Sequence, residues 1–181
     1  MQIRGKDIYV REFVINDAEE LLHLQKKNRA FFENFSMERN DGFYTIEAQK
    51  NRIKDFQLSI NQDRGYTYGI FKNDNHELIG TINLFQVVRG SIQSAFIGYF
   101  LDERNNGKGY TTEAVTLLVK YGFEMIKLHR IEAGVMPRNV RSIRVLEKSG
   151  FHKEGIAKQN VKINGRWEDH QVLAIINPFD Y

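Results

Sequence analysis

A glycine-containing turn, Arg104-Asn-Asn-Gly-Lys-Gly-Tyr110, constrains this chain more than any other segment. It lies between the apolar run Ala95 to Leu101, which predicts a strand, and the run Thr111 to Ile126, which predicts a helix. A turn that leads into a helix N-terminus gathers backbone N–H groups, and the helix dipole adds roughly +0.5 charge there. The segment therefore predicts an anion site, and a pyrophosphate is the expected ligand.

Two common phosphate-binding motifs are excluded by single positions of this turn. A Walker loop has Ser or Thr after its Gly-Lys pair, whereas here Lys108 is followed by Gly109. The dinucleotide fingerprint G-x-G-x-x-G needs a third glycine where this chain has Thr112. The turn instead has the pattern Arg/Gln-x-x-Gly-x-Gly/Ala, with Arg104 at its first position. The pyrophosphate is thus expected to belong to another class of ligand.

Composition indicates a globular protein without cysteine chemistry. The 181 residues predict one domain, residues 1–181, that buries about 70% of its unfolded surface. The balance of 26 Lys+Arg against 23 Asp+Glu is too even to indicate a direct nucleic-acid partner. The lack of cysteine excludes a disulfide framework, a cysteine zinc site and a thiol nucleophile, so any group transfer must be direct.

Neither a membrane segment nor a metal site is indicated. No window approaches the ~20 apolar residues that a membrane helix needs. The charged segment from Met1 to Asp7 lacks an apolar signal core. The five histidines show no metal-ligand spacing. The sequence therefore predicts a cytoplasmic chain with no membrane partner and no metal.

Periodicity and turn residues predict an α+β domain around the glycine turn. The expected strands are Ile8–Phe13, Tyr66–Lys72, Glu77–Val88, Ile92–Leu101, Ile131–Met136, Phe151–Asn164 and Arg166–Ile176. Further helices are expected after caps at Asn16, Thr45 and Asn139, and residues 31–42 are expected to form an irregular loop. These elements predict a mixed, mostly antiparallel sheet of six or seven strands, flanked by helices.

A second motif follows the glycine turn and indicates a family. Asn139-x-x-Ser142 is followed by Gly150-Phe151 and then by Glu154-Gly155. The two motifs, in this order, resemble those of the GNAT superfamily of N-acetyltransferases. Lys158 and the run Asn164 to His170 are most similar to the ribosomal-protein N-terminal acetyltransferases, especially the branch that acetylates an N-terminal alanine. The resemblance is strong over residues 95–176 and generic over residues 1–60.

The resemblance implies the GNAT fold, in which acetyl-CoA lies in a cleft between two splayed parallel strands, here Ala95–Asp102 and Arg130–Met136. The pantetheine would pair with strand backbone, and the turn would hold the pyrophosphate. Arg104 would contact phosphate or brace the loop, and Arg141 and Arg144 would approach the nucleotide or lie on a solvated face. The implied cofactor-binding residues are Phe100, Leu101, Asp102, Arg104, Asn106, Gly107, Lys108, Gly109, Tyr110, Thr111, Asn139 and Ser142.

The chemistry implied is attack of an amine on a thioester, which needs a neutral amine and a proton for the departing thiolate. Many relatives supply that proton from a tyrosine, but the corresponding residue here is Leu146. The ribosomal-protein branch implies Ser142 as the catalytic residue. The position of a glutamate base in some relatives is Val161 here, which leaves Asp169, His170 or a water relay as candidates. Glu154 is expected to be structural.

The expected acceptor is the N-terminal α-amine of a protein, possibly ribosomal in kind as in the related branch. An α-amine has a pKa of about 7.7–8.0, so a fraction is already neutral and a strong base is not needed. Two alternatives stay open: a small amine such as a polyamine or an aminoglycoside, and a non-catalytic CoA-binding regulatory or assembly protein. An exposed late strand is compatible with a homodimer. Four phenylalanines are expected either to form the floor of the acceptor site or to pack into the core: Phe31, Phe32, Phe35 and Phe43.

Overall fold

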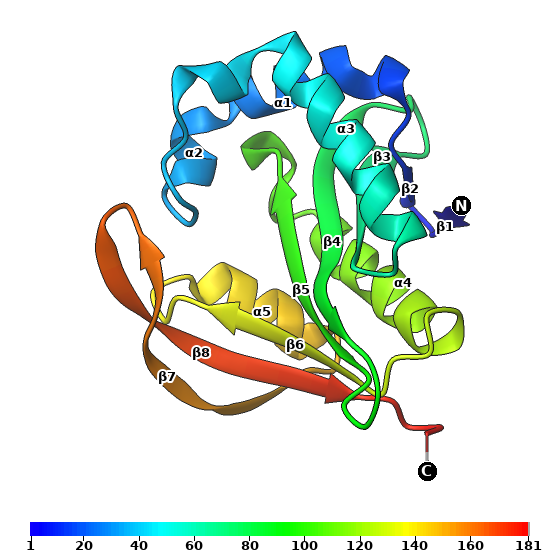
Figure 1. Ribbon diagram of the computed structural model, residues 1–181, viewed down its shortest axis with the longest axis vertical. Coiled ribbons are helices and arrows are strands. Elements are labelled where there is room, and N and C mark those ends of the chain that lie inside the picture. Colours follow the sequence, from blue (N-terminus) through cyan, green and yellow to red (C-terminus); the bar gives the residue numbers. More distant parts are fainter. Residues whose placement is uncertain (181) are drawn as a thin grey trace.

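An eight-stranded mixed sheet runs through the chain, in the strand order β1-β2-β3-β4-β5-β6-β8-β7 (Figure 1). The computed structural model describes residues 1–180. The strands are β1 Gln2–Arg4, β2 Ile8–Glu12, β3 Gly65–Lys72, β4 Leu78–Val88, β5 Ser94–Leu101, β6 Arg130–Val135, β7 His152–Ile163 and β8 Arg166–Ile176. The helices are α1 Ala18–Lys27, α2 Arg29–Glu33, α3 Ile46–Asn61, α4 Tyr110–Glu124 and α5 Val140–Lys148.

The sheet has one strand more than the six or seven expected. The additional strand is β1, whose three residues pair antiparallel with β2 at the edge of the sheet. Three residues are too few to show an alternating pattern, so this strand could not be predicted from periodicity. The other strands lie where they were expected, and the Asn164-Gly165 turn joins β7 to β8 with both residues at positive φ.

The N-terminal helices begin and end differently from the prediction in two places. Asn16 does not cap α1, because a 3-10 turn over Ile15–Asp17 precedes it and the Asp17 carboxylate accepts from Val14 N–H and from Arg11. Residues 31–42 are not all irregular, since α2 extends to Glu33 and a 3-10 turn begins at Asp41. The cap predicted at Thr45 is confirmed, with Oγ1 accepting from Ala48 N–H at 3.2 Å.

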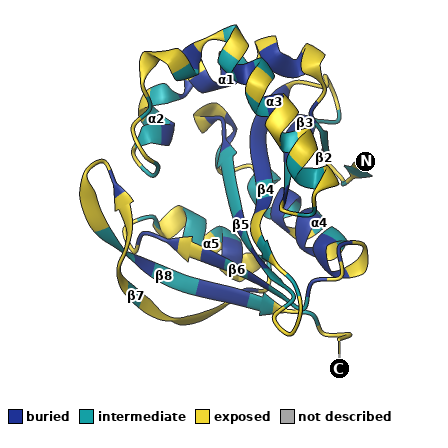
Figure 2. Cartoon of the chain, viewed as in Figure 1, coloured by how far each residue is buried: buried dark blue, intermediate teal, exposed yellow. Residues whose placement is uncertain are grey.

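Helices cover the two faces of the sheet unequally. On one face α1 and α3 bury Leu21 and Ile53 against Phe71 and Phe13. On the other face α4 packs a larger apolar cluster, centred on Leu118, against β2–β6. Figure 2 shows these inner surfaces buried and β7 exposed along nearly its whole length. None of the helices in residues 1–180 is long and apolar enough to cross a membrane.

The parallel pair β5 and β6 separates partway along its length. The two strands pair only at Ser94↔Arg130, Ala95↔Ile131 and Phe96↔Glu132. Beyond Phe96, β5 continues to Leu101 and β6 to Val135 without pairing each other (Figure 1). The predicted splayed strands are therefore present, and they leave one edge of β5 with unpaired backbone groups.

Candidate active site

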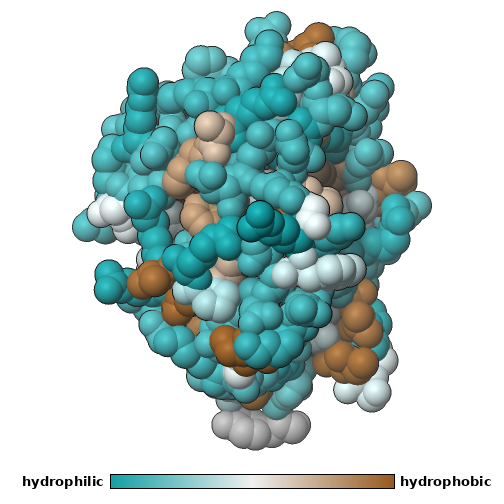
Figure 3. Space-filling model, turned by 90° about the vertical axis from the view of Figure 1, so that its left-hand side faces the viewer, coloured by the Kyte–Doolittle hydropathy of each residue, from teal (hydrophilic) through white to brown (hydrophobic). Residues whose placement is uncertain are grey.

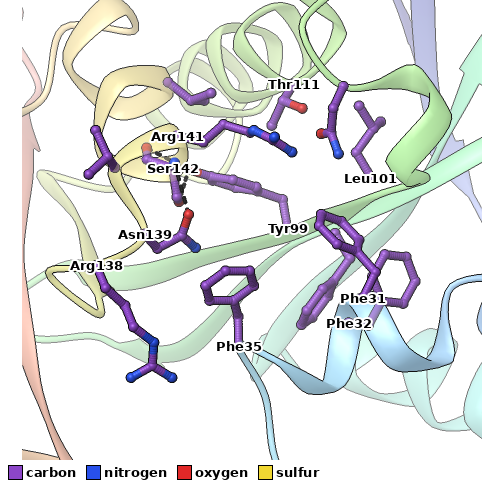
Figure 4. A pocket seen from close by; sticks show the side chains of 14 residues that line it. Phe31, Phe32, Phe35, Tyr99, Leu101, Thr111, Arg138, Asn139, Arg141 and Ser142 are labelled. Carbon is purple, nitrogen blue, oxygen red and sulfur yellow. Dashed lines mark hydrogen bonds between the residues drawn. The ribbon is translucent and has the colours of Figure 1, made fainter.

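Cavities lie on both sides of the opening between β5 and β6. A cavity of about 320 Å³, shown in Figure 4, is lined by α2, β5 and the start of α5. A second cavity, of about 350 Å³, extends from the same opening towards β4, β6 and β8. Both cavities are lined by Phe35, Tyr99, Phe100, Asn139 and Ser142. They are therefore two halves of one cleft that passes between the strands.

The glycine turn lines a third cavity, of about 360 Å³, which shares Asn106, Thr111 and Arg141 with the first. Gly107 and Gly109 have φ values of +78° and +86°, and apart from each glycine and its two chain neighbours no described residue has an atom within 4 Å of where a Cβ would stand. The buried Nδ2 of Asn106 has no hydrogen-bond partner among these residues. Open backbone and an unsatisfied donor at a helix N-terminus fit the pyrophosphate of acetyl-CoA.

The backbone register of β5 corrects part of the predicted pantetheine site. Asp102 N–H donates to Ile79 O at 2.7 Å, and its carbonyl accepts from Asn105 N–H. Because backbone groups alternate between the two neighbours of a strand, the groups of Phe100 also face β4. The unpaired edge is therefore formed by Tyr99 and Leu101. The predicted contact of Phe100 and Asp102 backbone with the cofactor does not agree with this register.

The polar side chains of the turn differ in what they contact. Asp102 is buried and binds Lys27 Nζ at 2.5 Å. Burial raises the pKa of Asp102, but Lys27 and the Arg104 N–H outweigh it and the net pKa is lowered. Lys108 Nζ lies 3.3 Å from Asn105 Oδ1. Within residues 1–180 the exposed Arg104 guanidinium makes no hydrogen bond or ion pair, so loop bracing does not occupy it.

The remaining predicted cofactor residues lie where two helices begin. Tyr110 is the first residue of α4 and packs against the core, and Thr111 lines the first and third cavities. Arg144 is exposed at the rim of the third cavity, beside Arg141. The cap predicted at Asn139 is confirmed, because its Oδ1 accepts from Ser142 N–H at 3.2 Å. That bond places Ser142 in the first turn of α5, at the centre of the cleft.

A tyrosine that the sequence reasoning missed contacts Ser142. The Tyr99 hydroxyl lies 2.7 Å from Ser142 Oγ, and Figure 4 shows both side chains in the cleft. Burial raises the pKa of Tyr99 to about 12, so the phenol stays protonated at neutral pH. Leu146, which occupies the position of the tyrosine acid of many relatives, is fully buried in the core. The sequence feature that could have indicated Tyr99 is its position on the strand that was predicted to border the cleft.

Aromatic side chains of α2 and the segment after it form the wall opposite α5 (Figure 4). Phe32 is buried with its ring centroid 5.1 Å from that of Phe100. Phe31 and Phe35 are half-buried and line the cavity. Phe43 instead packs against Tyr44, so three of the four phenylalanines adjoin the cleft. Figure 3 shows the molecular face on this side as mostly hydrophilic, with a few apolar side chains between polar ones.

The two base candidates on β8 have different surroundings. Asp169 is bound by Lys158 Nζ at 2.8 Å and by Gln159 N–H, and the Lys158 bond lowers the pKa of its carboxyl. His170 is buried and lines the second cavity. Its Nδ1 lies 3.1 Å from Glu168 O. A carbonyl can only accept, so Nδ1 carries the proton and Nε2 keeps a lone pair.

The glutamate of the Glu-Gly motif is structural, as expected. Glu154 forms an ion pair with Arg130 that ties β7 to β6 across β8, and a hydrogen bond with His152 on its own strand. These partners, Arg130 first, lower the pKa of Glu154 to about 2. Val161, at the base position of some relatives, is exposed on β7 next to a bulge. Neither residue lines the cleft described above.

A mixed sheet whose parallel strands splay over an open phosphate-binding turn is the fold of an acyl-CoA-dependent transferase. The sequence model of the acetyltransferase (GNAT) domain matches residues 7–152. The chain therefore belongs to the GNAT acetyltransferase family and is an acetyl-CoA-dependent N-acetyltransferase.

Similar proteins support this assignment along nearly the whole chain. The chain is 62% identical over 178 residues to the probable N-acetyltransferase YjcK of Bacillus subtilis, covering 98% of each. It is 33% identical over 162 residues to the [ribosomal protein uS5]-alanine N-acetyltransferase of Escherichia coli, covering 90% of this chain and 84% of that protein.

Solved structures give the same result. The ribosomal-protein-S5-alanine acetyltransferase of Vibrio fischeri superposes with a TM-score of 0.93 at 30% identity, covering 99% of this chain and 98% of that one. RimJ of Mycobacterium smegmatis, in complex with CoA-disulfide, superposes with a TM-score of 0.88 at 26% identity, covering 93% and 81%.

Proposed function

We propose that this acetyltransferase acts on the N-terminal α-amine of a protein, with a ribosomal protein beginning in alanine as the candidate acceptor. The observation that carries the proposal is the lining of the cleft. Among the described residues that line its two halves, none is Asp or Glu. A polycationic amine needs carboxylates at its binding site, whereas a peptide N-terminus needs apolar walls and one proton acceptor. Relatives named for ribosomal-protein alanine acetylation support the same acceptor.

The residues at the centre of the cleft would supply the proton that the departing CoA thiolate takes up. Acetyl-CoA, when bound, supplies the thioester carbonyl that the amine attacks. Ser142 Oγ would give a proton to the departing sulfur, because α5 places its first turn at the end of the unpaired β5 edge. Tyr99, held neutral by its raised pKa, would orient and resupply that hydroxyl through the 2.7 Å contact. Leu101 and Tyr99 backbone would hold the pantetheine arm.

His170 would take the proton that the amine loses. It lines the half of the cleft towards β4 and β8, on the other side of the strands from the glycine turn, and its Nε2 lone pair is available. Asp169 is already bound by Lys158, which makes it the weaker base candidate. An α-amine is partly neutral near pH 7.5, so His170 needs to assist only the remaining fraction.

Acetyl transfer to a small acceptor panel tests this function. The panel contains peptides beginning with Ala, Ser or Met, an N-blocked peptide containing lysine, and spermidine, and mass spectrometry locates the added acetyl group. We expect product at free peptide N-termini, with Ala preferred. Product on spermidine or lysine alone would overturn the α-amine assignment, and so would the absence of product on every free N-terminus.

A further inference from the structure

Two arginines without a carboxylate partner pack on aromatic rings behind the cleft. The guanidinium carbons of Arg39 and Arg52 lie 4.3 Å and 4.7 Å from the ring centroid of Phe43. Arg39 also lies 5.9 Å from the ring of Phe100, which lines both halves of the cleft. Both guanidiniums therefore pack on the same ring, and Arg39 is also close to a ring that lines the proposed acceptor site.

Neutral amides hold these guanidiniums in place. Arg39 Nη1 donates to Gln25 Oε1 at 3.0 Å, and Arg52 Nη1 donates to Gln49 Oε1 at 2.7 Å. Both glutamines are buried, and Gln49 Nε2 donates to Phe43 O, which turns its oxygen towards Arg52. An amide oxygen orients a guanidinium but does not neutralise its charge. Each arginine has five N–H donors, so donors remain for another acceptor.

Other half-buried arginines of this chain have carboxylate partners. Arg11 binds Asp17, and Arg89 binds Asp63. Within residues 1–180, no carboxylate oxygen lies within 4.0 Å of a side-chain nitrogen of Arg39 or Arg52. The neighbouring Glu33 is bound instead by the Tyr44 hydroxyl and by Arg29.

Two like charges in a half-buried place repel each other. Burial and then the charge of Arg39 lower the pKa of Arg52 to about 10. An anion between the two guanidiniums would remove this repulsion and use their free N–H groups. A carboxylate suits such a pair, because a guanidinium offers it two parallel hydrogen bonds.

We propose that Arg39 and Arg52 bind a carboxylate of the acceptor, on an acidic side chain a few residues after the acetylated N-terminus. This inference rests on the proposed function, since it concerns the peptide that enters the same cleft. The ring of Phe100 lies between the cleft and Arg39. The first residue would lie at the cleft centre, and the following residues would pass the wall towards Arg39. The pair would thereby select acceptors by charge.

The test compares matched peptides that all begin with Ala and differ by Glu or Gln at one position, from the second to the sixth. With wild-type enzyme we expect KM to be about tenfold lower for the Glu peptide at one of these positions, which is the fold-change of one favourable ion contact. In Arg39→Gln and Arg52→Gln the KM values of the Glu and Gln peptides should become about equal, because that contact has been removed.

Arg64→Gln is the matched control, because Arg64 is exposed and its loss changes the net charge equally. The control should keep the preference for Glu. Equal KM values for Glu and Gln peptides with wild-type enzyme would overturn the inference, even if either arginine variant failed to fold. A preference that survives in both arginine variants would also overturn it. Failure of the proposed function differs from both outcomes, because no peptide would then be acetylated at its N-terminus.

Discussion

The hydroxyl of Tyr99 lies 2.7 Å from Oγ of Ser142 and 3.3 Å from the Ser142 carbonyl oxygen. This contact joins β5 to the first turn of α5 across the cleft. The carbonyl can only accept, so the tyrosine has two alternative acceptors on one residue. When it donates to Oγ, the serine proton is free to point into the cleft. When it donates to the carbonyl, its own lone pair can accept from the serine. The hydrogen bond between the two hydroxyls can thus form with either one as the donor.

The first prediction concerns this pair. Ser142→Ala should lower kcat by about tenfold, below the range usual for a positioned acid, because a thiolate is a modest leaving group. Tyr99→Phe should lower it by a similar or smaller factor. Because the two hydroxyls act as one unit, the double variant should be no slower than Ser142→Ala. Steady-state kinetics with an Ala-initiated peptide measures all three, and independent, multiplying effects would contradict the shared role.

The second prediction distinguishes a phosphate-binding role of the glycine turn from the effect of backbone strain on stability. Gly107→Ala places a Cβ at φ +78°, where it would enter the space proposed for phosphate. Gly90→Ala is the matched control, because Gly90 lies in the β4–β5 turn with φ +72° and, as at Gly107, the space for a Cβ is open among the described residues. Both should lose roughly 1 kcal/mol of stability from the left-handed backbone. Only Gly107→Ala should weaken CoA binding measured by calorimetry, and equal loss in the control would contradict the phosphate role.

The third prediction concerns the proton acceptor. His170→Gln should lower kcat/KM at pH 7 by about tenfold, a modest share of general-base catalysis. The deficit should shrink towards pH 9, because an α-amine of pKa about 8 then loses its proton without help. A pH series with one Ala-initiated peptide measures this. A deficit that stays constant from pH 7 to 9 would indicate that His170 only shapes the cleft.

Local patterns were sufficient to predict most elements, and the two motifs were sufficient to indicate the family. Seven strands, the Thr45 and Asn139 caps and the opening between β5 and β6 agree with the expectations. The strand β1 was missed because it is too short to show a pattern, whereas the differences at the site come from contact between distant segments. Tyr99 meets Ser142 across 43 positions, and the choice of Leu101 over Phe100 at the cleft edge depends on the register with β4. A sequence pattern shows that a strand alternates but not which neighbour each backbone group faces.

The fourth prediction uses the acid-sensitive ion pair on β7. Arg130 and His152 lower the pKa of Glu154 from its usual 4.5 to about 2. A lowered folded-state pKa adds stability above pH 4.5, and this contribution is lost as pH falls from 4.5 towards 2. Glu154→Gln should therefore be less stable than wild type at pH 6, and the difference should disappear near pH 2. Urea unfolding across this range measures it, and a difference that did not change with pH would contradict the assignment.

The last prediction concerns the β7–β8 turn, which holds the aromatic wall in place. Asn164 Oδ1 accepts from Glu38 N–H at 2.7 Å, and its Nδ2 donates to Glu33 O at 3.0 Å. These bonds hold both ends of the segment that carries Phe35. Asn164→Gly keeps the turn, because φ at this position is +48° and glycine tolerates it, but it removes both bonds.

In Asn164→Gly we expect faster hydrogen exchange at the Glu38 amide, because its acceptor is gone. The peptide KM should rise several-fold as the wall loosens, in the range of one lost hydrogen bond. The Kd for CoA should not change, since no residue of the aromatic wall lines the cavity at the glycine turn. Asn75→Gly, in the exposed β3–β4 turn, is the control and should alter neither readout. Unchanged exchange at Glu38 would show that other contacts hold this segment, with Arg138 and its hydrogen bond to Asn34 O the first to examine.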